Sequence, residues 1–126
     1  MSVFERITTD LRSGMVLTTP VERVQFTINS IDAEKGMVVF SVGAKTPVGI
    51  PRKCWNGIPD FLRGKGWVLI GSRYDTAPIG TLQEYLDQWW SEGKTHTSDA
   101  GYVASVLEYL KIVEVDHCRP SKVKLK

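Results

Sequence analysis

The sequence predicts an α+β fold, because helical periodicity and strand alternation occur in separate segments of one short chain. Apolar residues recur at helical spacing over residues 81–92 and 98–110. Residues 24–29 instead alternate between apolar and polar, which is typical of a half-buried strand. The order of these segments predicts an N-terminal helix and an antiparallel hairpin packed on a mainly helical second half.

The length and composition predict a single domain over residues 1–126. Of the 126 residues, 42% are hydrophobic and 24% are charged, as in ordinary globular domains. A chain of this length buries roughly two thirds of the surface that its unfolded form exposes, so it needs no metal or disulfide to hold a core. Residues 1–50 can form a small antiparallel sheet on residues 51–126, or a separate barrel-like unit.

The first element is a predicted helix over residues 2–13. Ser2 and Glu5 have the spacing of a capping box, in which each residue bonds the backbone of the other. The apolar residues that follow recur on one helical face, and Gly14 is placed to end the helix.

Strands follow this helix. Residues 15–19 and 24–29 are predicted strands, residues 32–36 a turn, and residues 37–42 the returning strand of a hairpin. Residues 43–50 are a predicted loop that ends in a short extended piece.

The middle of the chain predicts two short helical turns. Pro51 suits the start of a helix over residues 52–56, which Gly57 is expected to break. Residues 58–63 then form a second short helix, and residues 67–70 form an apolar strand.

Two amphipathic helices follow in the second half. Thr81 and Glu84 again have capping-box spacing at the start of the helix over residues 81–92. The helix over residues 98–110 has a buried stripe of valine and leucine.

Residues 112–125 are a predicted hairpin that follows these helices almost without a loop. From residue 58 onward, the order of helix, strand, two helices and hairpin resembles the winged helix-turn-helix superfamily. The resemblance implies DNA binding, with the second helix of the pair in the major groove and the hairpin wing on the backbone. The wing suits this role, since it carries Arg119, Lys122 and Lys124.

The helix that would read bases departs from the family's chemistry. Its outward face consists of Gly101, Ala104, Ser105 and Glu108, none of which donates well to a base edge. Small side chains let a second element approach closely instead. That element is either the N-terminal sheet of the same chain, which we favour, or a protein partner or second copy of the chain.

Charge is segregated along the chain, and segregated charge can position an anionic partner such as DNA or RNA. Residues 43–73 are basic, residues 81–116 are acidic and residues 117–126 are basic. Trp55 and Trp67 lie among the basic residues, as in surfaces that contact phosphates and stack bases, but we expect both rings in the core. The predicted nucleic-acid-binding residues are Arg52, Lys53, Arg63, Lys65, Arg73, Arg119, Lys122 and Lys124.

Catalytic, metal and membrane signatures are weak. No nucleophile motif, phosphate-binding loop or nucleotide-binding glycine pattern occurs, and we expect no cofactor. The spacing of zinc ligands is absent from the two histidines and two cysteines, which are His96, His117, Cys54 and Cys118. With only two cysteines in the chain, we expect both thiols to be reduced. No apolar stretch approaches the roughly 20 residues that span a bilayer, and no secretory signal is visible. We therefore expect a cytoplasmic protein, and we favour a non-catalytic function over an enzymatic one.

Two functions are compatible with these features. The first is a non-catalytic nucleic-acid-binding module that contacts mainly phosphates through the basic middle segment and the basic C-terminal hairpin. The second is a protein-interaction or self-association module with no nucleic-acid role.

Overall fold

Two antiparallel sheets and four helices make up the described part of the chain, which confirms the predicted α+β class. The structure is a computed structural model that describes residues 2–19, 24–41, 47–70, 81–87, 100–117 and 121–126. The helices are α1 (Val3–Asp10), α2 (Arg52–Leu62), α3 (Leu82–Asp87) and α4 (Ala100–Tyr109). The strands are β1 (Val16–Thr18), β2 (Gln25–Asp32), β3 (Met37–Ser41), β4 (Val48–Pro51), β5 (Val68–Leu69), β6 (Val113–Asp116) and β7 (Lys122–Leu125).

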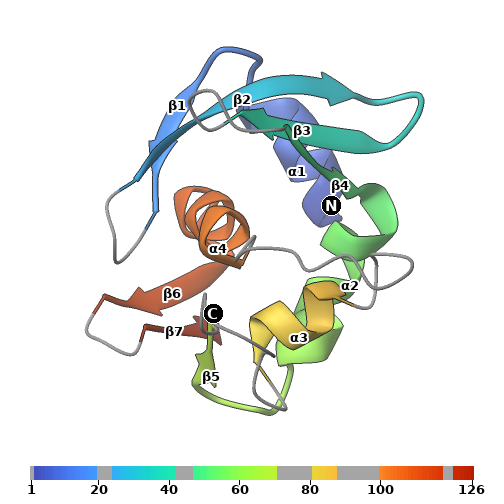
Figure 1. The fold of residues 1–126 in the computed structure, drawn as a ribbon. Helices are drawn as coiled ribbons and strands as arrows, with labels where there is room; N and C mark the ends of the chain where they lie inside the picture. The colour runs from blue at the N-terminus through green and yellow to red at the C-terminus, as the bar shows by residue number, and fades with distance from the viewer. Residues whose placement is uncertain (1, 20–23, 42–46, 71–80, 88–99, 118–120) are drawn as a thin grey trace.

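The N-terminal sheet has the strand order β1-β2-β3-β4 (Figure 1). Its centre is the predicted β2–β3 hairpin, whose turn is held by the Asp32 carboxylate. This carboxylate accepts hydrogen bonds from the backbone N–H groups of Glu34 and Lys35, each at 3.0 Å. Gly36 ends the turn with φ at +67°, which glycine adopts without strain. The short extended piece expected near residue 50 is the edge strand β4, which pairs with β3.

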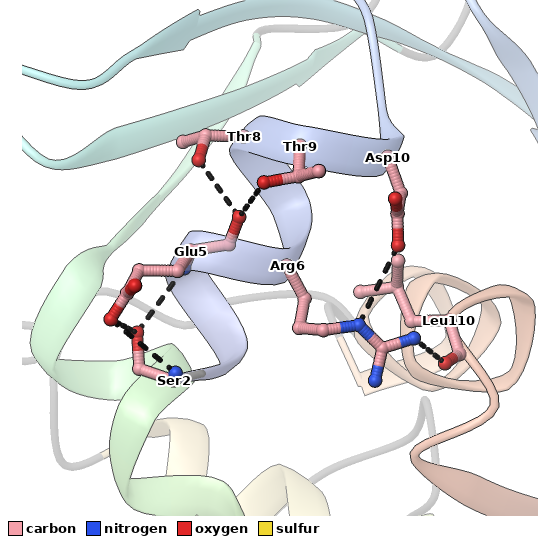
Figure 2. A network of polar contacts seen from close by, with 7 residues as sticks. All are labelled: Ser2, Glu5, Arg6, Thr8, Thr9, Asp10 and Leu110. Atoms are coloured by element: carbon pink, nitrogen blue, oxygen red, sulfur yellow. Dashed lines mark hydrogen bonds and ion pairs between the residues drawn. The ribbon is translucent and has the colours of Figure 1, made fainter.

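Helix α1 begins at the predicted capping box. The Ser2 hydroxyl accepts from the backbone N–H of Glu5, and the Glu5 carboxylate accepts from the backbone N–H of Ser2 (Figure 2). Arg6 links this helix to the far end of the chain, since its guanidinium donates to the carbonyl oxygen of Leu110 and lies 3.5 Å from the Asp10 carboxylate. The helix ends at Asp10, before the turn at Gly14.

Helix α2 is one continuous helix, so the predicted break at Gly57 is wrong. It also continues through Pro59, which has no N–H to donate to the preceding turn. Glycine and proline cost about 1 and 3 kcal/mol in a helix interior. Burial of one helix face outweighs this cost, because the side chains of Cys54, Trp55, Ile58 and Leu62 are all buried.

Gly57 has a packing role in this helix. A Cβ atom at this position would lie 2.4 Å from the phenolic oxygen of Tyr85, which donates to the carbonyl oxygen of Cys54 at 2.8 Å. We expect Gly57→Ala to lower the free energy of unfolding by up to about 2 kcal/mol. Displacing the buried phenol costs about 1–3 kcal/mol, and the better helix propensity of alanine offsets up to about 1 kcal/mol.

The control for this prediction is the same change in a Tyr85→Phe background. The nearest ring carbon would then lie 3.6 Å from the new Cβ, an ordinary contact, so alanine should stabilise by up to about 1 kcal/mol. Urea unfolding of the four proteins measures the difference. An equal cost of Gly57→Ala in both backgrounds would rule out the steric explanation.

The C-terminal sheet has the strand order β5-β7-β6. The predicted hairpin is present as β6 and β7, and β5 pairs with β7 through Val68↔Val123 and Leu69↔Lys122. At the start of α3, the Thr81 hydroxyl accepts from the backbone N–H of Glu84 at 3.1 Å. The predicted continuation of α3 to residue 92 lies outside the described residues.

Helix α4 lies between the two sheets (Figure 1). Its predicted stripe of Val103, Val106 and Leu107 is buried. Buried side chains of both sheets and of all four described helices belong to one continuous cluster. Among the described residues, no helix is both long and apolar enough to cross a membrane.

Candidate nucleic-acid interface

The outward face of the C-terminal sheet carries the basic wing residues. Side chains alternate along β7, so Val123 is fully buried while Lys122 and Lys124 point to the other side of the sheet. The same alternation places the exposed Lys126 on the side of Lys122 and Lys124. The backbone N–H of Lys126 donates to the carbonyl oxygen of Ile112 at 3.1 Å and so extends the pairing of the two strands. A line of lysines therefore follows the central strand of this sheet.

Two large apolar side chains lie beside these lysines. Val68 and Ile70 are buried, so the alternating residues Trp67 and Leu69 face outward and are 47% and 37% exposed. The expectation that Trp67 is a core residue is therefore wrong. The Lys124 ammonium lies 5.9 Å from the centre of the Trp67 ring, near the outer limit of a cation–π contact. We call Trp67, Leu69, Lys122 and Lys124 the sheet patch.

Acidic residues occupy the opposite edge of the same face. Glu114 is the register partner of Lys124, and Asp116 is the register partner of Lys122. Opposite charges at such positions attract across the strands. From β5 through β7 to β6, the outward face thus changes from apolar to basic to acidic.

Two more of the predicted nucleic-acid-binding residues, Arg63 and Lys65, directly follow the end of α2. The Lys65 ammonium lies 4.2 Å from the centre of the Phe61 ring and donates to the Phe61 carbonyl oxygen. Arg63 forms a 2.9 Å ion pair with Asp60, and both side chains are mostly exposed. An exposed pair of this kind contributes little stability, but it compensates the charge of Arg63 locally.

Arg52 and Lys53 lie at the other end of α2, about 15 Å away for an 11-residue helix. Arg52 has a structural role. Its guanidinium donates to the carbonyl oxygen of Ala33 at 2.6 Å and lies 5.0 Å from the centre of the Phe4 ring. It thereby connects α2 to the hairpin turn and to α1. Lys53 is exposed at this end of the helix.

The predicted residues therefore separate into two groups. Lys122 and Lys124 share the sheet patch, and Lys65 lies in the segment that leads into β5. Arg52 and Lys53 belong to the other end of α2. Arg73 and Arg119 lie outside the described residues.

The small-residue face of α4 contacts the chain itself. A Cβ atom on Gly101 would lie 3.7 Å from the Thr19 side chain, and the Ser105 hydroxyl donates to the Thr18 carbonyl oxygen at 2.8 Å. Ala104 is fully buried. Strand β1 and Thr19 therefore pack on this face, as the intramolecular alternative expects, and Ala104 and Ser105 are buried while Gly101 stays partly exposed.

A separate groove of about 520 Å³ lies between the ends of α1 and α4. Arg6, Asp10, Tyr109, Leu110 and Lys111 line it. The guanidinium of Arg6 is already bonded to two oxygen atoms of this groove (Figure 2), so it is a weaker candidate for binding an anion. Within the described ranges, no three histidine, cysteine or acidic side chains gather where they could hold a metal ion.

Leu69 was not among the residues that the sequence singled out. Residues 67–70 are all apolar, so the residue types do not show which side of this strand faces the core. The outward direction of Leu69 follows only from the pairing of β5 with β7.

Comparison with known proteins gives no relative for this chain: no family model, no curated protein and no solved structure matches it significantly.

Proposed function

We propose that the protein is a non-catalytic nucleic-acid-binding module that contacts phosphates through the sheet patch. The observation that carries the proposal is the row of lysines on β7 beside an exposed tryptophan. Lysine ammonium groups bind phosphates and release counterions, and exposed aromatic rings bind bases. The two kinds of group meet on one face, although β5 and β7 are far apart in the chain.

We also propose a winged helix-turn-helix arrangement for residues 51–126. In its support, α2, β5, α3, α4, β6 and β7 occur in the order that the resemblance requires. The strand before the helix pair joins the hairpin in one sheet. Helix α4 does not enter a major groove in this proposal, because Ala104 and Ser105 are buried against β1 and the exposed end of the helix carries Tyr109 and the acidic Glu108.

The experiment for this proposal neutralises the two lysines of the sheet patch. We expect Lys122→Gln with Lys124→Gln to weaken binding to labelled DNA or RNA at least tenfold at low salt. The slope of log affinity against log salt should become shallower by roughly 1.4 for single strands or 1.8 for duplexes, since each lost phosphate contact removes about 0.7 or 0.9. Glutamine avoids the like-charge pairs that glutamate would form with Glu114 and Asp116.

The matched control is Lys35→Gln with Lys53→Gln. Both lysines are exposed and lie away from the C-terminal sheet, at the hairpin turn and at the start of α2. The two double variants have the same net charge, so the control should retain most of the affinity. An equal loss in both variants would contradict the assignment to the sheet patch, and an unchanged salt slope would remove these lysines from the interface.

A protein contact is the second candidate function, because Trp67 and Leu69 form an exposed apolar pair. Sedimentation velocity over a range of concentrations tests self-association through this pair. A mass that rises with concentration, and that returns to the monomer value in Leu69→Lys, would support this candidate. A monomer throughout would exclude self-association there.

A further inference from the structure

We propose that the sheet patch binds single-stranded rather than double-stranded nucleic acid, with a base stacked on the indole ring of Trp67. This inference rests on the proposed function and specifies the form of the ligand. It follows from the order of apolar, basic and acidic side chains across the sheet.

Trp67 offers a surface for a base. Trp67 is 47% exposed, although tryptophan residues are on average highly buried. Leu69 extends the apolar surface along the same side of β5. The Lys124 ammonium is 5.9 Å from the ring centre and sits on a flexible stem, so it can move aside for a base. Loss of one such stacking contact weakens binding by about 5- to 150-fold.

The lysines are placed for the backbone of the same strand. Lys122 is the register partner of Leu69, and Lys124 lies over Trp67, so each apolar side chain has an ammonium group beside it. Alternate residues on one side of a strand are about 7 Å apart. This spacing allows successive phosphates of an extended chain to meet successive lysines while their bases turn toward β5.

The acidic edge argues against a duplex. Glu114 and Asp116 lie on β6, on the far side of the lysines from Trp67. A single strand fits over β5 and β7 and avoids these carboxylates. A duplex brings a second phosphate backbone, which they would repel. Paired bases also hide their ring faces within the stack, where an indole cannot reach them.

The experiment compares four labelled ligands of equal length by fluorescence anisotropy. They are a thymidine DNA strand, a uridine RNA strand, a DNA duplex and a DNA strand with abasic sites, which keeps the phosphates without the bases. The wild-type protein should bind the two base-bearing single strands more tightly than the duplex or the abasic strand. Comparison of the DNA and RNA strands shows which one it prefers.

Two variants assign the difference to Trp67. Trp67→Ala should lose about 5- to 150-fold in affinity for the base-bearing strands and little for the abasic strand. Trp67→Phe keeps an aromatic face and should retain much of the affinity. Thermal melting of both variants should change only slightly, since about half of Trp67 is exposed on the outward face of the sheet.

The outcomes separate the two proposals. Equal binding of base-bearing and abasic strands, or tighter binding of the duplex, would overturn the stacking inference while leaving phosphate binding intact. Absence of binding to every ligand at low salt would overturn the inference and the proposed function together.

Discussion

Replacing Trp55 with alanine is expected to lower the free energy of unfolding by about 3–5 kcal/mol, the usual cost of truncating a large buried aromatic residue. The Trp55 side chain is fully buried, and its ring meets the Phe40 ring edge-on with the centres 6.1 Å apart. The indole N–H donates to the carbonyl oxygen of Ile50 at 3.2 Å. Alanine removes the packing and leaves this carbonyl without its donor.

The matched control is Trp67→Ala. The same substitution removes a ring that is about half exposed, so we expect a stability change below about 1 kcal/mol. Urea unfolding of the two variants measures both effects under identical conditions. Trp55→Ala should therefore mainly lower stability, whereas Trp67→Ala should mainly lower the affinity for nucleic acid. Similar losses of stability in the two variants would contradict their placement.

The local elements were predictable because their signals are local. The capping box at Ser2 and Glu5 and the turn at Asp32 are each formed by neighbours in the chain, and the structure contains both. The hairpin over residues 112–125 was predicted in the same way, and its second strand carries the lysines of the sheet patch. Short-range patterns of this kind need no knowledge of the tertiary fold.

The mistaken predictions depended on contacts between distant segments. Gly57 breaks helices in general, but here the close Tyr85 phenol fits against it and the buried face of α2 keeps the helix continuous. Trp67 lies in a run of four apolar residues, and only the pairing of β5 with β7 shows that its side chain faces outward. Burial and long-range partners decided these positions, as they generally override propensity.

The order of elements from α2 to β7 resembles that of winged helix-turn-helix proteins, but here the N-terminal sheet packs on part of α4. Small residues on α4 let the N-terminal sheet approach so closely that Ser105 bonds to the backbone of β1. The candidate surface for a ligand is the outward side of the C-terminal sheet, where Trp67 and the lysines lie. Because the N-terminal sheet packs on α4, the candidate interface is the sheet patch and not this helix.

Ala104→Gln tests this arrangement directly. Ala104 is fully buried in α4, so the longer side chain would overpack the core and bury an amide. Overpacking costs about 1–3 kcal/mol, and an amide without partners costs a further 1–3 kcal/mol or so, which gives an expected loss of stability of about 2–6 kcal/mol. Unfolding in urea, followed by circular dichroism, measures this loss.

Tyr109→Gln is the control on the same helix, because Tyr109 is 49% exposed and its replacement should change stability by less than about 1 kcal/mol. If α4 instead presented Ala104 to a ligand, glutamine there would leave the fold intact and add a side chain able to bond a base edge. An Ala104→Gln protein as stable as wild type, with tighter duplex binding, would therefore restore α4 as the reading helix. Loss of stability would show that Ala104 is buried in the core, and the sheet patch would stay the candidate interface.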